Sequence, residues 1–395
     1  MSRARWLVLV ALWGCNVPYM YPLHDRIQAG DEQGARKVLD DALTDPKLAA
    51  DRRGLALLER AALRVGNAPA KAVLADIAAG DRLLETADLT AAATSKKMKN
   101  PRSMRQYERN GAIRYVGKKL VLKPHERLYE NVLGMAAAFA AGDRSAMRVE
   151  ARRLALTRTD LHSYALSARA YDLMGIGGLL ASYAFESHDR NEACLFATEA
   201  ARISKANVVA AQVSATCSST ETTSETEDTD KFMHSTHTTA KVRGVVLAGL
   251  APALSTSVTT RPFSVTERPA PPDPEVSVDG ARVNVDRLVD FAPIAFDFWQ
   301  KALCMGQGQD AWQTLPGRIF AFEHALEPGT HTVRVKVGAR ERTHRIVVTN
   351  ADIGLLDSFL FEHGQEGAPL RRLSVMVKDE ARLCEETTVN AAPSL

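Results

Sequence analysis

Hydrophobic and small residues recur at helical spacing through the first half of the chain. In the segment 27–43, Gly30, Ala35, Leu39 and Ala42 follow one another at intervals of five, four and three residues. This spacing places small residues where two antiparallel helices touch, and it places apolar residues on their shared face. Similar patterns recur in segments 57–77, 132–151 and 180–200.

Each of the four copies resembles the second half of a tetratricopeptide (TPR) repeat, in which paired helices stack into a superhelix. A single repeat cannot bury its apolar face alone, so neighbouring repeats stabilise one another. We therefore predict a TPR-like α-solenoid over residues 24–208. An irregular helical domain without true repeats is the alternative.

From about residue 241 the pattern becomes strand-like. Segment 242–250 predicts a buried strand, and 276–285 predicts a hairpin with its turn at Asp279–Gly280. Residues 288–303 have apolar spacing that fits a helix. Further strands are predicted at 318–322, 330–337 and 343–348. We therefore predict a small β-sandwich-like domain with one inserted helix over residues 241–364.

Alternation in the predicted strand 330–337 indicates one wet and one buried face. His331 falls with the valines on the buried face, so we expect a core histidine that has a hydrogen-bond partner and is not a metal ligand.

The region before this domain, 209–240, is rich in Ser, Thr and acids, which predicts a flexible linker. Its His234 and His237 form an HxxH pair without a rigid helix to fix metal ligands, so we expect no metal site there.

The N-terminus has the three-part layout of an export signal. A short basic segment, 2–5, precedes an apolar stretch, 6–13, which is too short to span a bilayer. The residues Leu12, Gly14 and Cys15 then resemble the lipobox of bacterial lipoproteins, in which the cysteine is acylated. This resemblance implies signal-peptide recognition at Leu12 and Gly14, cleavage after Gly14 and lipidation of Cys15. A plain secretory signal, or an uncleaved start, is the alternative.

The resemblance also implies a location. Two or three acyl chains hold a protein on a membrane essentially permanently. Asn16 follows the cysteine, and aspartate at that position resembles an inner-membrane retention signal. We therefore expect anchoring in the outer membrane, facing the periplasm.

These boundaries describe an α+β multidomain chain. Its predicted parts are a signal peptide (1–14), a lipidated tether (15–23), the helical repeats (24–208), the linker (209–240), the β-rich domain (241–364) and a partly ordered C-terminal tail (365–395).

Composition narrows the functional classes. The chain has 395 residues, of which 46% are hydrophobic and 25% charged, so its length allows two domains with separate cores. Removal of Arg3 and Arg5 with the signal leaves 48 basic residues against 47 acidic ones, which does not favour nucleic acid as a partner.

No CxxC pair or zinc-like spacing occurs among the five cysteines. Disulfides among the last four and inert thiols are both open. They are Cys194, Cys217, Cys304 and Cys384.

A wider resemblance covers most of the mature chain. It rests on residues 123–134 followed by 142–153 and, in the last third, on 312–318 and 326–333. These segments resemble the signature of a family of TPR-containing bacterial lipoproteins of unassigned activity. Its members tend to be encoded beside lipoproteins that resemble penicillin-binding-protein activators or curli-assembly components. The resemblance therefore implies a role in envelope assembly.

Motifs for catalysis are absent from the sequence. It has no GxSxG turn, HExxH helix, phosphate-binding loop or GxGxxG turn. We therefore expect a non-catalytic scaffold without cofactors that binds envelope proteins or peptides. An envelope hydrolase or peptidoglycan-modifying enzyme with dispersed catalytic residues is the alternative.

The segment that carries the resemblance is rich in charged residues. They could form ion pairs within the scaffold or line a peptide-binding groove. The candidate partner-binding residues are Glu126, Arg127, Glu130, Arg148 and Arg152.

Overall fold

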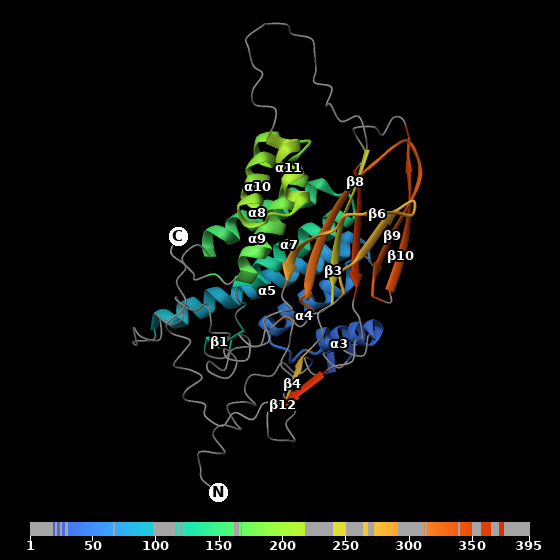
Figure 1. Cartoon of the computed structure of the whole chain (residues 1–395). Helices are drawn as coiled ribbons and strands as arrows, with labels where there is room; N and C mark the ends of the chain where they lie inside the picture. Colours follow the sequence, from blue (N-terminus) through green and yellow to red (C-terminus); the bar gives the residue numbers. More distant parts are fainter. Residues whose placement is uncertain are drawn as a thin grey trace, which may run out of the picture.

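The structure is a computed structural model of the whole chain (Figure 1). It describes residues 19, 22–23, 26–27, 31–65, 68–97, 115–116, 119–120, 122, 124–161, 166, 168–217, 240–249, 264–267, 272–290, 312, 314–338, 340–349, 357–364 and 371–374. The signal peptide and Cys15 lie outside these residues, as do most of the predicted linker and tail.

Helices make up the N-terminal part, as predicted. They are α3 (Glu32–Thr44), α4 (Ala50–Arg64), α5 (Ala70–Lys97), α7 (Pro124–Ala140), α8 (Arg144–Leu161), α9 (Ala168–Phe185), α10 (Arg190–Ile203) and α11 (Asn207–Cys217).

Aspartates begin three of these helices. The carboxylates of Asp31 and Asp189 accept hydrogen bonds from Gly34 N and Glu192 N, at 2.7 and 3.0 Å. Asp143 accepts one from Ala146 N at 2.9 Å. Each bond satisfies a backbone N–H that has no partner inside the first turn. Each of these three aspartates therefore caps the start of a helix.

Strands form two four-stranded sheets in the C-terminal part. One has the order β10-β9-β5-β6 and is antiparallel; the other has the order β11-β3-β8-β7. In the second sheet, β11 pairs with β3 in parallel and the other neighbours are antiparallel. The strands of these sheets are β3 (Ala240–Ala248), β5 (Glu275–Val278), β6 (Ala281–Val283), β7 (Asp286–Asp290), β8 (Arg318–Leu326), β9 (Gly329–Val337), β10 (Arg340–Val348) and β11 (Asp357–Gly364).

Two short pairs complete the described strands: β1 (Tyr115–Val116) with β2 (Lys119–Leu120), and β4 (Ser264–Glu267) with β12 (Arg371–Ser374).

The molecule has three layers: helices, the β11-β3-β8-β7 sheet, and the β10-β9-β5-β6 sheet (Figure 1). One core cluster fills the space between the sheets, with Val242 and Val246 of β3 facing Val333 and Val335 of β9. Because side chains alternate along a strand, neighbouring residues of β3 face the helices. Val245 and Leu247 accordingly belong to the helical core.

The helical and β-rich parts therefore do not keep separate cores. The helical cluster includes Leu288, Trp312 and Ile319 from the C-terminal part, together with the interiors of α7 and α9. Sequence patterns could not reveal this sharing, because a continuous apolar run such as that of β3 indicates burial on both faces without naming the partner on each face.

Several sequence-based boundaries shift in the structure. Residues 209–217 of the predicted linker belong to α11, so the helical part ends at Cys217. At the N-terminus, Tyr19, Leu23 and Ile27 are buried against α3 and α4, so the folded body begins before residue 24.

Two predictions in the β-rich part need correction. Leu288 to Asp290 lie in strand β7, not in a helix, because Leu288 and Val289 fill the space between sheet and helices. The rest of the predicted inserted helix lies outside the described residues. His331 is half-buried at the rim and is not in the core.

His331 does have the expected partners. Its Nδ1 lies 2.7 Å from the Asp279 carboxylate, and its Nε2 lies 2.7 Å from the carbonyl oxygen of Glu327. Asp279 also accepts a hydrogen bond from Thr332 N at 2.7 Å and adopts a positive φ of 51° beside Gly280 at 83°. The histidine thus braces the predicted β5–β6 turn, which the structure confirms.

Among the described residues, no helix is both long enough and apolar enough to cross a bilayer.

Candidate interaction surfaces

The face of the helical layer formed by α7, α9 and α11 is covered by the chain's own sheet. These helices pack against β11, β7 and β8, respectively. Nearly every residue of α7 from His125 to Phe139 is buried, and so is nearly every residue of α9. A peptide therefore cannot lie along this face while the sheet is in place.

Glu126, a predicted partner-binding residue, is part of this internal contact. It is fully buried, and its carboxylate accepts a hydrogen bond from Trp312 N at 2.9 Å. The Trp312 ring meets Tyr129 edge-on, with ring centroids 4.9 Å apart.

Next to this contact, Thr314 N and Oγ1 both donate to the buried carboxylate of Glu59, at 2.9 and 2.5 Å. The indole Nε1 of Trp312 donates to Thr314 Oγ1 at 2.7 Å. Trp312 and Thr314 are thus held between α4 and α7, and the two glutamates act inside the fold.

Glu130, the second predicted carboxylate, belongs to a buried ionic cluster between α5, α7 and α8. Arg153 donates to Glu150 at 2.9 Å and to Asp81, and its Nη2 lies 3.7 Å from Glu130. Burial raises the pKa of Glu130 well above its ordinary value, and the charge of Asp81 raises it further. None of these four residues lines either of the two cavities described below.

A third internal network joins α9 to the sheet. Arg243 of β3 is 1% exposed and donates to Glu186 and Glu323 at 2.7 and 2.8 Å. Its guanidinium carbon lies 4.2 Å from the centre of the Tyr183 ring. Burial alone would raise the pKa values of both glutamates, but the charge of Arg243 brings both below their ordinary value.

The predicted arginines lie closer to the surface. Arg148 reaches the carbonyl oxygen of Ala184 at 3.5 Å, and the guanidinium of exposed Arg152 lies over the Phe185 ring, 5.7 Å from its centre. Arg127 is half-buried on α7. Of the five predicted residues, the structure thus turns both acids inward and places Arg148 and Arg152 together on α8.

Large hydrophobic side chains are exposed beside these two arginines. Val149 and Leu156 of α8 are 56% and 67% exposed, and Leu195 of α10 is 58% exposed. Val149, Arg152 and Leu156 are three and four residues apart, so they share one face of α8. An ion pair between Arg158 and Glu199 joins α8 to α10 on the opposite side of α8, so Leu195 of α10 does not belong to this face. We call Val149, Arg152 and Leu156 the outer patch.

The sequence analysis missed the apolar members of this patch. Exposed Val149 interrupts the run of charges in α8, and this was the available signal. This signal was not sufficient, because the packing of α7 and α9 decides which face of α8 is buried, and the sequence of α8 does not show that packing.

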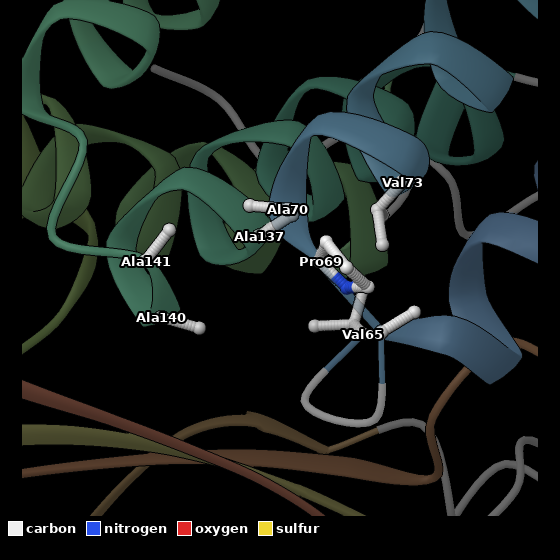
Figure 2. A pocket seen from close by; sticks show the side chains of 8 residues that line it. Val65, Pro69, Ala70, Val73, Ala137, Ala140 and Ala141 are labelled. Carbon is white, nitrogen blue, oxygen red and sulfur yellow. The ribbon is translucent and has the colours of Figure 1, made fainter.

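An apolar groove of about 310 Å³ opens elsewhere, between the α4–α5 turn and the end of α7. Figure 2 shows Val65, Pro69 and Val73 on one side and Ala137 and Ala140 on the other. Its lining side chains are small and without charge, so it offers apolar contact and no polar recognition.

A second, polar hollow of about 420 Å³ lies on the open face of the outer sheet. Cross-strand ion pairs line it, Arg334 with Glu341 at 3.1 Å and Lys336 with Glu275 at 3.5 Å. Such exposed pairs are typical of a solvated sheet face.

Cys194 and Cys217 form a disulfide that links α10 to the end of α11. This is one of the pairings that the sequence left open. Cys304 and Cys384 lie outside the described residues. Among the described residues, no group of three or more histidine, cysteine or carboxylate side chains could hold a metal ion.

Comparison with known proteins adds little. No protein-family model matches the chain, and no curated protein matches it. One solved structure, the crystal structure of the S-layer protein rSbsC(31-844), shows 13% sequence identity over 79% of this chain, with a TM-score of 0.11. The chain spans 45% of the length of that structure. Such a distant likeness carries no argument, and the resemblance to TPR-containing lipoproteins stays a prediction.

Proposed function

We propose that this chain is a lipid-anchored lipoprotein of the bacterial outer membrane that acts as a non-catalytic protein-interaction scaffold in envelope assembly. The outer patch carries the proposal. Two large hydrophobic side chains, Val149 and Leu156, are exposed beside Arg152 on a helix that otherwise turns its large apolar residues inward. Exposed apolar clusters rimmed by polar residues are typical of protein-binding surfaces.

Export is supported by the disulfide. Disulfides persist in oxidising compartments such as the periplasm and are rare in the cytosol. The Cys194–Cys217 link therefore agrees with the signal sequence and lipobox that end at Cys15. Acylation of Cys15 would give the anchor.

A TPR-like arrangement of the helices is also part of the proposal. Each helix packs on the next one along the chain, and α7 packs on α9 as well as on α8. This is the neighbour pattern of stacked helical pairs. The docking face differs from the expected one, because the chain's own sheet covers α7, α9 and α11.

The outer patch favours an acidic partner. Arg148 and Arg152 lie along the exposed side of α8, which also carries one exposed carboxylate, Asp160, whereas Glu150 is turned inward to Arg153. A partner segment with apolar side chains and flanking carboxylates would match both the hydrophobic and the basic parts of the surface.

The test is a crosslinking pull-down of the acylated protein from intact envelopes, read by mass spectrometry. Val149→Glu with Leu156→Glu should remove the partner from the captured set, because two carboxylates would repel an acidic surface. Val347→Glu is the matched control, since Val347 is 58% exposed on β10, in the other layer.

A Cys15→Ser variant tests the anchor in the same experiment. It should lose both membrane attachment and the partner. Unchanged capture by the Val149/Leu156 variant would overturn the docking face, and unchanged localisation of Cys15→Ser would overturn the lipoprotein assignment.

A further inference from the structure

The folded body begins only a few residues after Cys15. Tyr19 is 5% exposed, and its hydroxyl donates to the carbonyl oxygen of Arg52 in the first turn of α4, at 3.1 Å. Leu23 and Ile27 continue this contact at 0% and 2% exposure, in one apolar cluster with α3 and α4. Tyr19 is therefore a fixed point of the fold.

This fixed point limits how far the body can move from the proposed lipid anchor. Four peptide steps separate Cys15 from Tyr19, and they span about 14 Å when fully extended. The headgroup layer on each side of a bilayer takes up roughly 5–8 Å of that distance. The first turn of α4 must then stay next to the headgroups.

The surface at this place is suited to phosphate. The α3–α4 turn and the start of α4 expose Lys47 and partly expose Arg52 and Arg53. Asp45 is exposed there too, whereas Asp51 is buried. Lys47 thus faces solvent, Arg52 and Arg53 do so in part, and Arg53 also donates to the carbonyl oxygen of Asp45 at 2.9 Å. With one exposed carboxylate beside them, these cations leave a positive surface, which is attracted to anionic lipid headgroups.

The outer patch lies far along the row of helices from this place. Helix α3 packs on α4, α4 on α5, α5 on α7, and α7 on α8 and α9 (Figure 1). Several helix widths, each about 10 Å, therefore separate the α4 N-terminus from the outer patch on α8.

We propose that residues 45–53 rest on the phospholipid headgroups of the anchoring bilayer, so that the short tether fixes the orientation and presents the outer patch away from the membrane. This inference rests on the proposed lipidation of Cys15. It adds a lipid-binding surface and a fixed orientation, neither of which a long flexible tether would give.

The test places a photo-crosslinking phenylalanine analogue at one of two exposed positions of the full chain, in place of Lys47 or in place of Asn191 on α10. The acylated protein is purified and returned to vesicles of phosphatidylethanolamine and phosphatidylglycerol. Lipid adducts are counted by mass spectrometry. We expect at least tenfold more adduct from position 47 than from position 191.

A longer tether tests whether the short distance from Cys15 to Tyr19 sets the orientation of the protein on the membrane. Insertion of about 12 Gly/Ser residues after Asn16 should reduce the adduct at position 47 several-fold while leaving the protein on the vesicle. Equal adducts from both positions, or an unchanged adduct with the spacer, would overturn the proposed orientation.

A second preparation distinguishes failure of this inference from failure of the lipoprotein assignment. The N-terminal peptide mass shows whether Cys15 is acylated in the cell. In a Cys304→Ser, Cys384→Ser chain that starts at Cys15, the Cys15 thiol can be joined to a maleimide lipid in the same vesicles. Preferential labelling at position 47 there supports the orientation even without cellular acylation, and its absence there contradicts the orientation alone.

Discussion

The main-chain N–H of Trp312 donates to the carboxylate of Glu126 at 2.9 Å, although 186 residues separate them in the sequence. Thr314 makes the corresponding contact with Glu59 across 255 residues. A short segment of the C-terminal part thus completes the interior of the helical part. These contacts explain why buried glutamates occur on α4 and α7, where a helical core would otherwise be apolar.

Thr314→Val should destabilise the fold by about 1–3 kcal/mol, because the change leaves the buried Trp312 Nε1–H without its acceptor and removes a donor to Glu59. The measurement is urea unfolding. Thr159→Val, an exposed change on α8, is the control and should stay near zero. An equal loss of unfolding free energy in the two variants would show that the contacts of Thr314 with Trp312 and Glu59 do not stabilise the fold.

Arg243→Met should cost about 3–5 kcal/mol, because it leaves the largely buried Glu186 without this cation and leaves Glu323 with Lys241 alone. Adding Glu186→Gln should recover part of that loss by removing one of the stranded charges. Arg282→Met, on the exposed face of β6, should change the free energy of unfolding by less than about 0.5 kcal/mol. An equal change in the free energy of unfolding for Arg243→Met and Arg282→Met would show that the ion pairs of Arg243 do not stabilise the fold.

Glu130→Gln should remove a pH dependence of stability. Burial, followed by the charge of Asp81, raises the folded-state pKa of Glu130 above its unfolded value of about 4.3. Its contribution is therefore fully present below pH 4.3 and is lost as the pH rises through the folded-state pKa. The variant should match the native chain near pH 4 and become progressively more stable than it at higher pH. Urea unfolding across this range measures the difference, and a constant difference would contradict the raised pKa.

Gly54→Ala should destabilise the α4–α5 contact by about 1–3 kcal/mol. A Cβ at Gly54 would lie 2.9 Å from the carbonyl oxygen of Gly80, and a Cβ at Gly80 would lie equally close to that of Gly54. Neither backbone can move without separating the helices. Gly175→Ala meets only the side chain of Ile203 at 3.2 Å, so thermal unfolding should show a much smaller loss for this control.

Reduction of the Cys194–Cys217 disulfide should lower stability by about 3 kcal/mol, since it releases a loop with a sequence separation of 23 residues. The Cys194→Ser, Cys217→Ser chain should unfold like the reduced native chain. Peptide mapping without reductant should recover the two cysteines in one linked peptide. Alkylation of both thiols before reduction would show that the link is absent.

Local features of the fold were predictable from the sequence. Alternation placed β9 and its buried valines correctly, and Asp279–Gly280 marked the β5–β6 turn. Each of these signals acts over a few residues, where backbone geometry and side-chain spacing decide the outcome.

Contacts between distant segments were not predictable. Glu126 and Glu130 share a helix face with spacing that also fits solvent-exposed ion pairs, and nothing near them indicates that Trp312 or Arg153 lies opposite. Leu288 and Val289 fit a helical pattern but form part of β7. In both cases a layer formed far along the chain determines burial, and local periodicity carries no information about that layer.

The contacts of Trp312 and Thr314 with α4 and α7 also set an order in which the molecule assembles. During synthesis or export the chain emerges from its N-terminus, so Glu59 and Glu126 are present long before the backbone donors that they require. Closing such a long loop adds little free energy beyond that of a shorter one, but contacts so distant in sequence form slowly. In a chain cut short before Trp312, the carboxylates of Glu59 and Glu126 would lack these donors, and the Tyr129 ring would lack its contact with Trp312. The interior of the helical layer therefore closes only after Trp312 and Thr314 have been synthesised.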